Sequence, residues 1–202
     1  DRIVFTLYGG SSEDRRMVAH TLRKELGTLC FVDNETHASS QFIDSLVRLQ
    51  KRVVLAESCT GGLIAKHLTD VSGSSRAFWG SFVTYDNEAK KELLEVQSLE
   101  RCGAVSDEVA VEMAKGALRV SNADIAISVT GIAGPGGGSR EKPVGTVYLA
   151  IAQSVSNIRT FRCSFGGSRS RIRTRTAITA ILLGWGVLEG LDIDSNPIWN
   201  YI

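Results

Sequence analysis

A serine at the end of a short apolar run is the residue of this chain best placed for covalent chemistry. Residues 53–62 read Val-Val-Leu-Ala-Glu-Ser-Cys-Thr-Gly-Gly, so a buried-type strand ends in a polar turn with Ser58 at the junction. Turns between a strand and a helix are where α/β folds expose a reactive side chain and direct backbone N–H groups at a negative charge. The stretch therefore predicts covalent catalysis, anion binding or both.

The simplest alternative is that Ser58 only caps the helix that follows, which is the commonest task of a serine at such a position. Gly61 and Gly62 argue for more, because two glycines just after a cap destabilise a helix by roughly 1 kcal/mol each relative to alanine. Such a cost suggests a ligand that approaches the backbone closely. Cys59 is a rival nucleophile, although adjacent side chains in the turn point in different directions and only one of them can face a site.

Activation of Ser58 needs a base, and the chain contains only three histidines. Two lie in the N-terminal stretch and His67 lies about two turns into the helix, so a Ser-His-Asp triad is hard to assemble. A lysine is the natural substitute if burial or neighbouring positive charge lowers its pKa. Lys90 fits, because it follows a strand end and a polar turn and lies at a helix start, where the dipole disfavours a cation. The alternative is an ordinary solvated lysine, as we expect of Lys91.

A glycine-rich loop follows another buried-type strand. Thr130 lies at the end of that strand, as Ser58 does at the end of its own, and five glycines lie between residues 131 and 138. Such loops let backbone N–H groups face a phosphate or carboxylate. The spacing matches neither a P-loop nor a dinucleotide-binding fingerprint. A flexible surface loop is the alternative.

A basic segment near the C-terminus could hold a phosphate. Six arginines and no acidic residue occur between Arg159 and Arg175. Arg169 and Arg173 are four residues apart on one helix face, which is directed at the end of a strand, where α/β sheets bind ligands. A solvated strand edge and helix face is the alternative.

Composition limits the classes that remain. With 202 residues and 43% hydrophobic content the chain can bury one sizeable core, and no apolar run reaches the length of a membrane span. A net charge of +1 argues against bulk nucleic-acid binding. Four cysteines without C-x-x-C spacing make a zinc site unexpected and suit a reducing cytoplasm, where we expect the protein. No signal peptide is visible. The chain begins without Met, which would suit a fragment of a longer protein.

Hydrophobic periodicity predicts a mixed sheet between helical layers. Phe42, Ile43, Leu46 and Leu49 are expected on one face of a helix that precedes the Ser58 strand. The remaining expected elements are strands at 3–8, 29–32, 53–56, 78–85 and 124–129, a hairpin of 144–152 with 158–165, and helices at 13–26, 63–68, 87–94, 106–120 and 169–188.

Five motifs, taken in order along the chain, resemble a known family. They are Ala56–Gly62, Val83–Lys90, Gly103–Ser106, Thr130–Pro135 and Lys142–Thr146. Their sequence is similar to that of the CinA C-terminal domain family, the nicotinamide-nucleotide amidohydrolases or NMN deamidases. The resemblance covers about residues 46–188 and is specific, because five ordered motifs agree.

The resemblance implies hydrolysis of the carboxamide of nicotinamide mononucleotide, with release of ammonia, as a salvage step for pyridine nucleotides. It implies that Ser58 is the nucleophile, Lys90 the base and Thr130 a supporting hydroxyl, and that Arg169 and Arg173 are the basic residues after the last strand. It also implies a three-layer α/β/α sandwich that self-associates as a homo-oligomer and needs neither metal nor cofactor.

The chain is expected to contain two domains. Residues 1–35 are expected to be a small α+β appendage resembling the tail of the linking region in full-length CinA proteins, whose upstream domain is missing here. Residues 36–202 are expected to be the amidohydrolase domain. The expected partner is a small nucleotide substrate, with no nucleic acid and no membrane.

Different segments of the site are expected to bind different parts of the substrate. The N–H groups of the turn Cys59, Thr60, Gly61 and Gly62 would stabilise the oxyanion. The substrate-binding residues would be Tyr85, Gly131, Gly134, Gly136, Gly137, Arg169 and Arg173, with the loop and the arginines on the 5′-phosphate. A non-catalytic domain that binds a nucleotide or phosphate ligand through the same turns stays open as the alternative.

Overall fold

The computed structural model describes residues 38–191 and Ile193, with a few positions nearer the N-terminus: Ser11, Glu13, Asp14, Met17, Val18 and Thr21. Apart from these few positions, the appendage expected over 1–35, with its two strands and its helix, lies outside the described residues. So does the end of the chain beyond Ile193.

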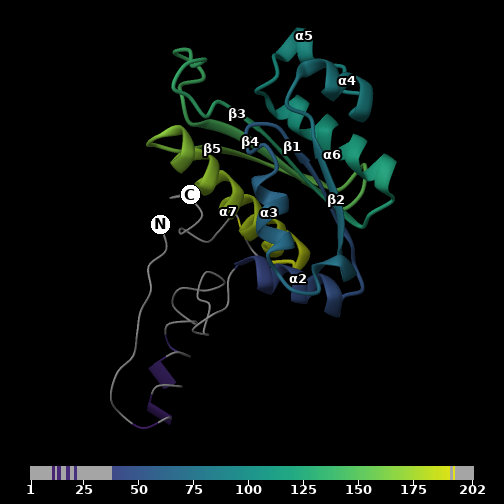
Figure 1. The fold of residues 1–202 in the computed structure, drawn as a ribbon, viewed down its shortest axis with the longest axis vertical. Coiled ribbons are helices and arrows are strands. Elements are labelled where there is room, and N and C mark those ends of the chain that lie inside the picture. Colours follow the sequence, from purple (N-terminus) through teal and green to yellow (C-terminus); the bar gives the residue numbers. More distant parts are fainter. Residues whose placement is uncertain are drawn as a thin grey trace.

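Five strands form one mixed sheet in the order β2-β1-β3-β4-β5 (Figure 1). The strands are β1 (Val53–Glu57), β2 (Phe78–Val83), β3 (Ile125–Gly131), β4 (Thr146–Ala152) and β5 (Ile158–Ser164). β1 is parallel to both of its neighbours, whereas β3 with β4 and β4 with β5 pair antiparallel. The carboxyl ends of β2, β1 and β3 therefore meet at one edge of the sheet, and the end of β1 lies between the other two.

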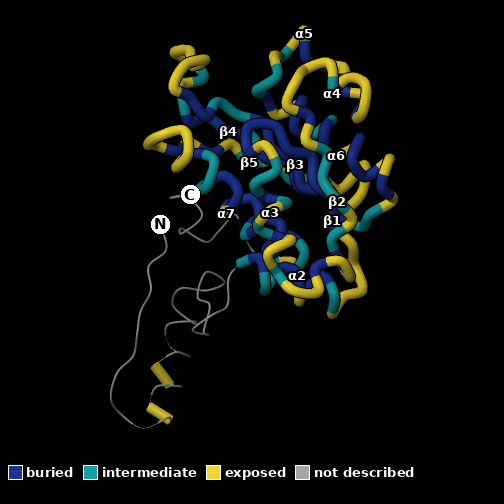
Figure 2. The backbone as a smooth tube through the Cα atoms, in the orientation of Figure 1, coloured by how far each residue is buried: buried dark blue, intermediate teal, exposed yellow. Residues whose placement is uncertain are grey.

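Helices cover both faces of this sheet, which confirms the expected three-layer α/β/α arrangement. On one side lie α2 (Ala38–Arg48), α3 (Leu63–Thr69) and α7 (Arg169–Leu188), and on the other lie α4 (Asn87–Leu94), α5 (Leu99–Cys102) and α6 (Asp107–Ser121). A short 3-10 turn, η2 (Ser74–Arg76), leads into β2. Figure 2 shows the inner strands buried between the two helical layers.

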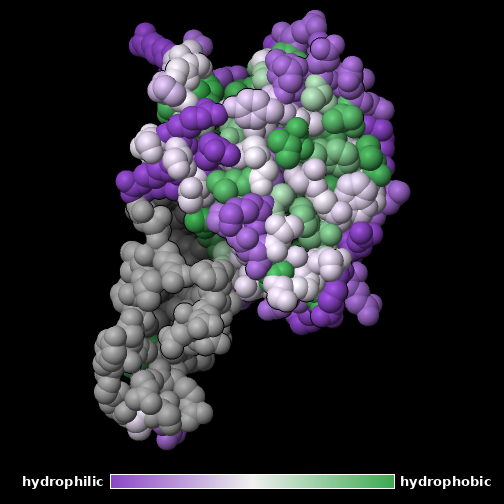
Figure 3. All heavy atoms as spheres, in the orientation of Figure 1, coloured by the Kyte–Doolittle hydropathy of each residue, from purple (hydrophilic) through white to green (hydrophobic). Residues whose placement is uncertain are grey.

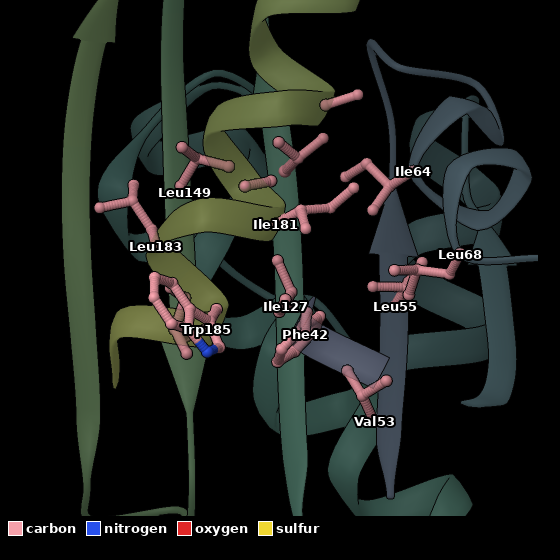
Figure 4. Packing of buried hydrophobic residues seen from close by; sticks show 14 of the residues in the cluster. Phe42, Val53, Leu55, Ile64, Leu68, Ile127, Leu149, Ile181, Leu183 and Trp185 are labelled. Atoms are coloured by element: carbon pink, nitrogen blue, oxygen red, sulfur yellow. The ribbon is translucent and has the colours of Figure 1, made fainter. Parts of the chain in front are cut away.

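Side-chain alternation along β1 divides the core into two halves. Val53 and Leu55 belong to the cluster under α2, α3 and α7, whereas Val54 and Ala56 belong to the cluster under α6. Figure 4 shows the first of these clusters, in which side chains from the sheet meet those of the covering helices. Every residue of β1 is buried, as the continuous apolar run predicted.

Helix ends follow the sequence signals. Ser106 caps α6 and Ser168 caps α7, each accepting a hydrogen bond from the backbone N–H three residues on. Asp86 caps α4 by accepting from Glu88 N. These caps set where α4, α6 and α7 begin, which in turn sets the positions of the side chains on their first turns.

A few expectations about the elements need correction. Leu49 is 38% exposed and lies beyond the end of α2, because the helix stops at Arg48 and Gln50 adopts a positive φ of 54°. β2 ends at Val83 rather than at Tyr85, and β3 continues to Gly131, so that Thr130 is a strand residue. The short helix α5 and the turn η2 were not anticipated.

The open edge of the sheet carries apolar surface. Trp79 and Val83 of the edge strand β2 are 37% and 48% exposed, and the Trp79 ring stacks on Phe82. Figure 3 shows apolar side chains at the surface on the side of the view where β2 lies. In the part of the chain that the structure describes, no helix is both long enough and apolar enough to cross a membrane.

One close contact between α4 and α6 can be tested. A Cβ added at Gly116 of α6 would lie 2.2 Å from the carbonyl oxygen of Leu94 in α4. Helix propensity alone would make Gly116→Ala stabilising by about 1 kcal/mol, but overpacking of this kind costs about 1–3 kcal/mol. We expect Gly116→Ala to lower the free energy of unfolding measured in urea.

Gly166→Ala is the control, because no atom lies within 4 Å of the Cβ built there. Its effect should stay within about 0.5 kcal/mol. A Gly116→Ala protein more stable than the wild type would contradict the close packing of α4 on α6.

Candidate active site

Ser58 continues the sheet at the end of β1. Its backbone N–H donates to the carbonyl oxygen of Val129 at 3.0 Å, as the next rung of the parallel ladder between β1 and β3. The side chain is 9% exposed, and Oγ makes no hydrogen bond among the described residues. The helix α3 begins only at Leu63, with Gly62 as its N-cap and no side-chain cap. The interpretation of Ser58 as a capping residue is therefore wrong.

Glu57, rather than Ser58, accepts the hydrogen bonds of the first N–H groups of α3. This carboxylate has no exposed surface and accepts hydrogen bonds from Ile64 N at 3.1 Å and Ala65 N at 2.9 Å. It also accepts from Ser81 Oγ of β2 at 3.2 Å. A negative charge at a helix N-terminus is favourable, because the first N–H groups of a helix lack partners within it. Glu57 thus links β1, β2 and α3 immediately beside Ser58.

The turn between β1 and α3 owes its shape to Gly61 and Gly62. Their φ angles are 57° and 88°, in the left-handed region that favours glycine. Gly61 N–H donates to the carbonyl oxygen of Ser58 at 3.0 Å, so it is already occupied. The N–H groups of Cys59, Thr60 and Gly62 donate to no backbone acceptor among the described residues. Of the four donors expected for an oxyanion, these three are therefore available.

Three hydroxyl-bearing residues share one side of the sheet at the ends of adjacent strands. The register pairs Glu57 with Val83 and with Val129, so Ser58 lies between Thr84 and Thr130. Alternation places all three on the α4/α6 side, since each follows a residue of the opposite side. The core clusters agree, with Ala56 on the α6 side.

Cys59 lies on the other side, in the core beneath α7. It is 6% exposed, and burial raises the pKa of its thiol to about 12. A thiol that stays protonated at neutral pH is a poor nucleophile. Ser58 is therefore the better placed of the two neighbours.

Lys90 is buried on α4, with 1% of its surface exposed, so the interpretation as a solvated lysine is wrong. Its Nζ donates to the backbone oxygens of Tyr85 at 3.2 Å and Asp86 at 3.4 Å. Burial lowers the pKa of Lys90, against the opposing influence of Asp86 and Cys59. Lys91 is exposed and pairs with Glu100 at 3.0 Å. No hydrogen bond joins Lys90 to Ser58 in the described part of the chain.

Thr130 uses its hydroxyl to hold a neighbouring loop. Oγ1 donates to the carbonyl oxygen of Ala104 at 2.6 Å, and the side chain is 1% exposed. Lys142 supports the same loop, with Nζ donating to Val105 O at 2.7 Å and Cys102 O at 3.2 Å. The motif at 103–106 is thereby held beside the end of β3.

Arg169 joins two segments that are far apart in sequence. Its guanidinium donates to the carbonyl oxygen of Gly134, in the glycine-rich loop, at 2.8 Å and to Tyr85 Oη at 2.7 Å. The Tyr85 side chain is 58% exposed, so this pair lies at the surface of the site. The structure therefore brings together Arg169, Gly134 and Tyr85.

Arg173, one turn further along α7, holds the turn between β1 and α3. Nε donates to Cys59 O at 3.1 Å and an Nη donates to Thr60 O at 2.5 Å. A Cβ at Gly61 would lie 3.4 Å from this guanidinium, so a glycine leaves it room. The expectation that the two arginines share a direction holds, but Arg173 reaches the turn rather than the loop.

The rest of the glycine-rich loop is less closely tied to this arrangement. Gly131 ends β3, and Gly136 and Gly137 lie in an exposed stretch. Within the described residues, no hydrogen bond links Gly136 or Gly137 to Ser58, Lys90, Arg169 or Arg173. The described residues also contain no cluster of three or more His, Cys, Asp or Glu side chains placed to hold a metal ion.

Sequence reasoning missed Glu57, Thr84 and Lys142 as parts of the site. Glu57 carried a signal, since it is the one carboxylate in an otherwise apolar buried-type strand. Nothing in the sequence distinguished Thr84 or Lys142 from the other residues of their motifs, because their roles depend on contacts across the sheet.

Comparison with known proteins identifies the family. The family model described as the CinA C-terminal domain matches residues 35–184. The chain belongs to the CinA C-terminal domain family. A nicotinamide-nucleotide amidohydrolase PncC of Enterobacter agglomerans is 52% identical over 131 residues, which cover 64% of this chain and 80% of that protein. A CinA-like protein of Geobacter sulfurreducens is 56% identical over 132 residues, or 64% of this chain.

This CinA-type chain matches only part of its longer relatives, since the aligned residues cover 32% of the Geobacter protein. Among solved structures, the competence/damage inducible protein CihA of Agrobacterium tumefaciens has a TM-score of 0.70 and 39% sequence identity. That match covers 92% of this chain and 99% of the other. The fold of this CinA domain is therefore shared with proteins of its family.

The role of Glu57 can be tested without knowing a substrate. Glutamine in its place would accept one of the two helix N–H bonds and leave the other unpaired, which costs about 1–3 kcal/mol. We expect Glu57→Gln to lower the free energy of unfolding and to slow the labelling of Ser58 by a sulfonyl fluoride more than tenfold, measured by mass spectrometry.

Glu112 offers a matched control. It too accepts two backbone N–H bonds and one serine hydroxyl, from Gln97 N at 2.8 Å, Ser98 N at 2.9 Å and Ser98 Oγ at 2.5 Å. Glu112→Gln should cost similar stability while Ser58 labels at the wild-type rate. Equal labelling rates for the two variants would mean that Glu57 contributes only to stability.

Proposed function

We propose that this chain hydrolyses the carboxamide of nicotinamide mononucleotide to nicotinate mononucleotide and ammonia, with Ser58 as nucleophile and Lys90 as base. The observation that carries the proposal is the buried Lys90 on the same side of the sheet as Ser58, with a pKa lowered by burial. The PncC relative, named a nicotinamide-nucleotide amidohydrolase and 52% identical, supports the choice of substrate.

The contacts of Lys90 suit a neutral amine. A neutral amine has two N–H groups and one lone pair, whereas an ammonium has three N–H groups and no acceptor. Two backbone oxygens, of Tyr85 and Asp86, accept from Nζ. With both N–H groups engaged in this way, the lone pair remains to take a proton from a hydroxyl.

The acylation half of the reaction then needs two transfers of one proton. Lys90 takes the proton of Ser58 as Oγ attacks the carboxamide carbon, and the N–H groups of Thr60 and Gly62 stabilise the oxyanion. Lys90 returns the proton to the departing nitrogen, so that ammonia leaves and an ester on Ser58 remains. In the second half, Lys90 takes a proton from water as the water attacks the ester, and returns it to Ser58 Oγ as the ester bond breaks and nicotinate mononucleotide leaves.

The phosphate of the substrate is assigned to the opposite side of the site from Lys90. Arg169 lies between Tyr85 and the glycine-rich loop, and a guanidinium with free N–H groups suits a phosphate. Arg173 is engaged with the turn and adds positive charge nearby. The exposed Gly136 and Gly137 would contribute backbone N–H groups.

Removing either member of the Ser-Lys pair should abolish ammonia release. We expect Ser58→Ala and Lys90→Met to lower kcat by at least about a thousandfold, because both the nucleophile and its base are required. Methionine keeps an unbranched apolar stem in the buried Lys90 position, and coupled detection of ammonia measures turnover. Wild-type activity should rise with pH through the lowered pKa of Lys90, since only the neutral amine accepts a proton.

Two neighbouring residues are controls. Lys91→Met alters an exposed lysine beside Lys90, and Cys59→Ala alters the thiol beside Ser58; both should keep turnover near the wild-type rate. Turnover by Ser58→Ala would rule out this mechanism. A wild-type protein that binds the nucleotide but releases no ammonia would instead be the non-catalytic binding domain.

The assignment of the phosphate to Arg169 predicts a change in selectivity. We expect Arg169→Gln to raise KM for the mononucleotide about tenfold or more, since a charge-assisted hydrogen bond is lost. The same variant should affect nicotinamide riboside, which lacks the phosphate, much less. Steady-state kinetics with the two amides measure the ratio.

Arg119→Gln is the control for a general change of charge, because Arg119 lies in the last turn of α6, across the sheet from α7, and pairs at the surface with Glu95 at 2.9 Å. It should leave both KM values unchanged. An equal loss on both amides in Arg169→Gln would show that Arg169 braces Tyr85 and Gly134 without touching the phosphate.

A further inference from the structure

Thr84 holds a buried hydroxyl that has no hydrogen-bond partner. Its side chain has no exposed surface, and Oγ1 is unpaired within the described part of the chain, as is Oγ1 of Thr60 in the turn between β1 and α3. Leaving a buried hydroxyl unpaired costs about 1–3 kcal/mol, so such a group in a folded protein requires an explanation.

The sheet places this hydroxyl beside the nucleophile. Ala56 pairs with Phe82 and Glu57 with Val83, and the next step of the same register brings Ser58 opposite Thr84. Ala56 and Phe82 both pack into the α6-side core. Side chains two residues apart along a strand point to the same side, so Ser58 and Thr84 also face α6. At this position the side chains are hydroxyls instead of apolar groups.

The other neighbour of Ser58 is already occupied. Thr130 Oγ1 donates its proton to Ala104 O at 2.6 Å, so it has none to offer Ser58. Thr84 retains its proton, and Ser58 Oγ makes no hydrogen bond in the described structure. Ser58 and Thr84 directly follow the paired ends of β1 and β2. Opposite side chains on paired strands are neighbours, so a rotation about one side-chain bond can direct one of these hydroxyls at the other.

We propose that Thr84 is a positioning residue for the nucleophile: its hydroxyl donates a hydrogen bond to Ser58 Oγ and thereby directs the Ser58 proton at Lys90. The inference rests on the proposed Ser-Lys function. Thr84 keeps its own proton throughout, so no proton passes between Thr84 and Ser58. When the proton passes from Ser58 to Lys90, the serine oxygen gains negative charge, and the bond from Thr84 becomes charge-assisted and stronger.

The test uses a change that separates this role from a structural one. Valine has the shape of threonine without the hydroxyl, so Thr84→Val removes an unpaired polar group and should leave Tm unchanged or raise it. We expect kcat and the rate of Ser58 labelling by a sulfonyl fluoride to fall about tenfold to a hundredfold, with KM within about twofold. Thr84→Ser should restore both rates to within about threefold of the wild type.

Thr176→Val supplies the control. Thr176 is a fully buried threonine of α7 whose hydroxyl is paired with Ile172 O at 2.8 Å. It should lose stability and keep both rates. Thr84→Ala repeats the comparison with a smaller side chain in case valine is not tolerated at the site.

The outcomes separate the two proposals. Wild-type rates in Thr84→Val and Thr84→Ala would overturn the role of Thr84 while leaving the proposed amidase activity intact. A fall in rate that is explained by a matching fall in Tm would overturn it too. A wild-type protein that labels at Ser58 but hydrolyses no mononucleotide would refute the proposed substrate, and the labelling rates would still decide the role of Thr84.

Discussion

The hydrogen bonds of Glu57 are the constraint on which the geometry of this site depends. The carboxylate holds the first N–H groups of α3 and the hydroxyl of Ser81 with no exposed surface of its own. Ser58, the next residue, is tied to β3 through its N–H. The turn from 58 to 62 is therefore fixed at both ends, by the ladder at its start and by the carboxylate at the helix. A turn held in this way can keep backbone N–H groups directed at a ligand without reorganisation when charge develops.

The two sides of the sheet hold side chains with different chemistry. Alternation sends the neighbours Ser58 and Cys59 to opposite sides, the first towards α4 and α6 and the second into the core under α7. The side that holds Ser58 also holds Lys90 and two threonines, and burial there lowers the pKa of the lysine. On the other side burial raises the pKa of the cysteine. One physical cause, removal from water, thus favours the neutral form of both groups; a neutral amine can accept a proton, whereas a neutral thiol is a poor nucleophile.

The sequence predicted the order and type of elements in residues 38–191 well, because apolar periods of two and 3.6 residues and the caps at Ser106 and Ser168 are local signals. It failed at Leu49, where a backbone reversal at Gln50 ended the pattern one residue earlier. It predicted Ser58, Lys90 and the arginines as candidates, but not what they contact. The bond of Thr130 to Ala104 and those of Arg173 to the turn join residues separated by 26 and more than 100 positions. No local pattern encodes such pairs, since they exist only once the sheet order is known.

The two arginines on one face of α7 illustrate why spacing alone could not assign them. Four residues separate them, so both point towards the ends of the strands, yet Arg169 reaches the loop and Arg173 the turn. A peptide unit is planar and trans, so its carbonyl and its N–H point in opposite directions. When Arg173 holds the carbonyl of Cys59, it directs the N–H of Thr60 away from α7. A cation on one side of the turn therefore sets the direction of a hydrogen-bond donor on the other, and Gly61, which lacks a side chain, lets it come close enough to do so.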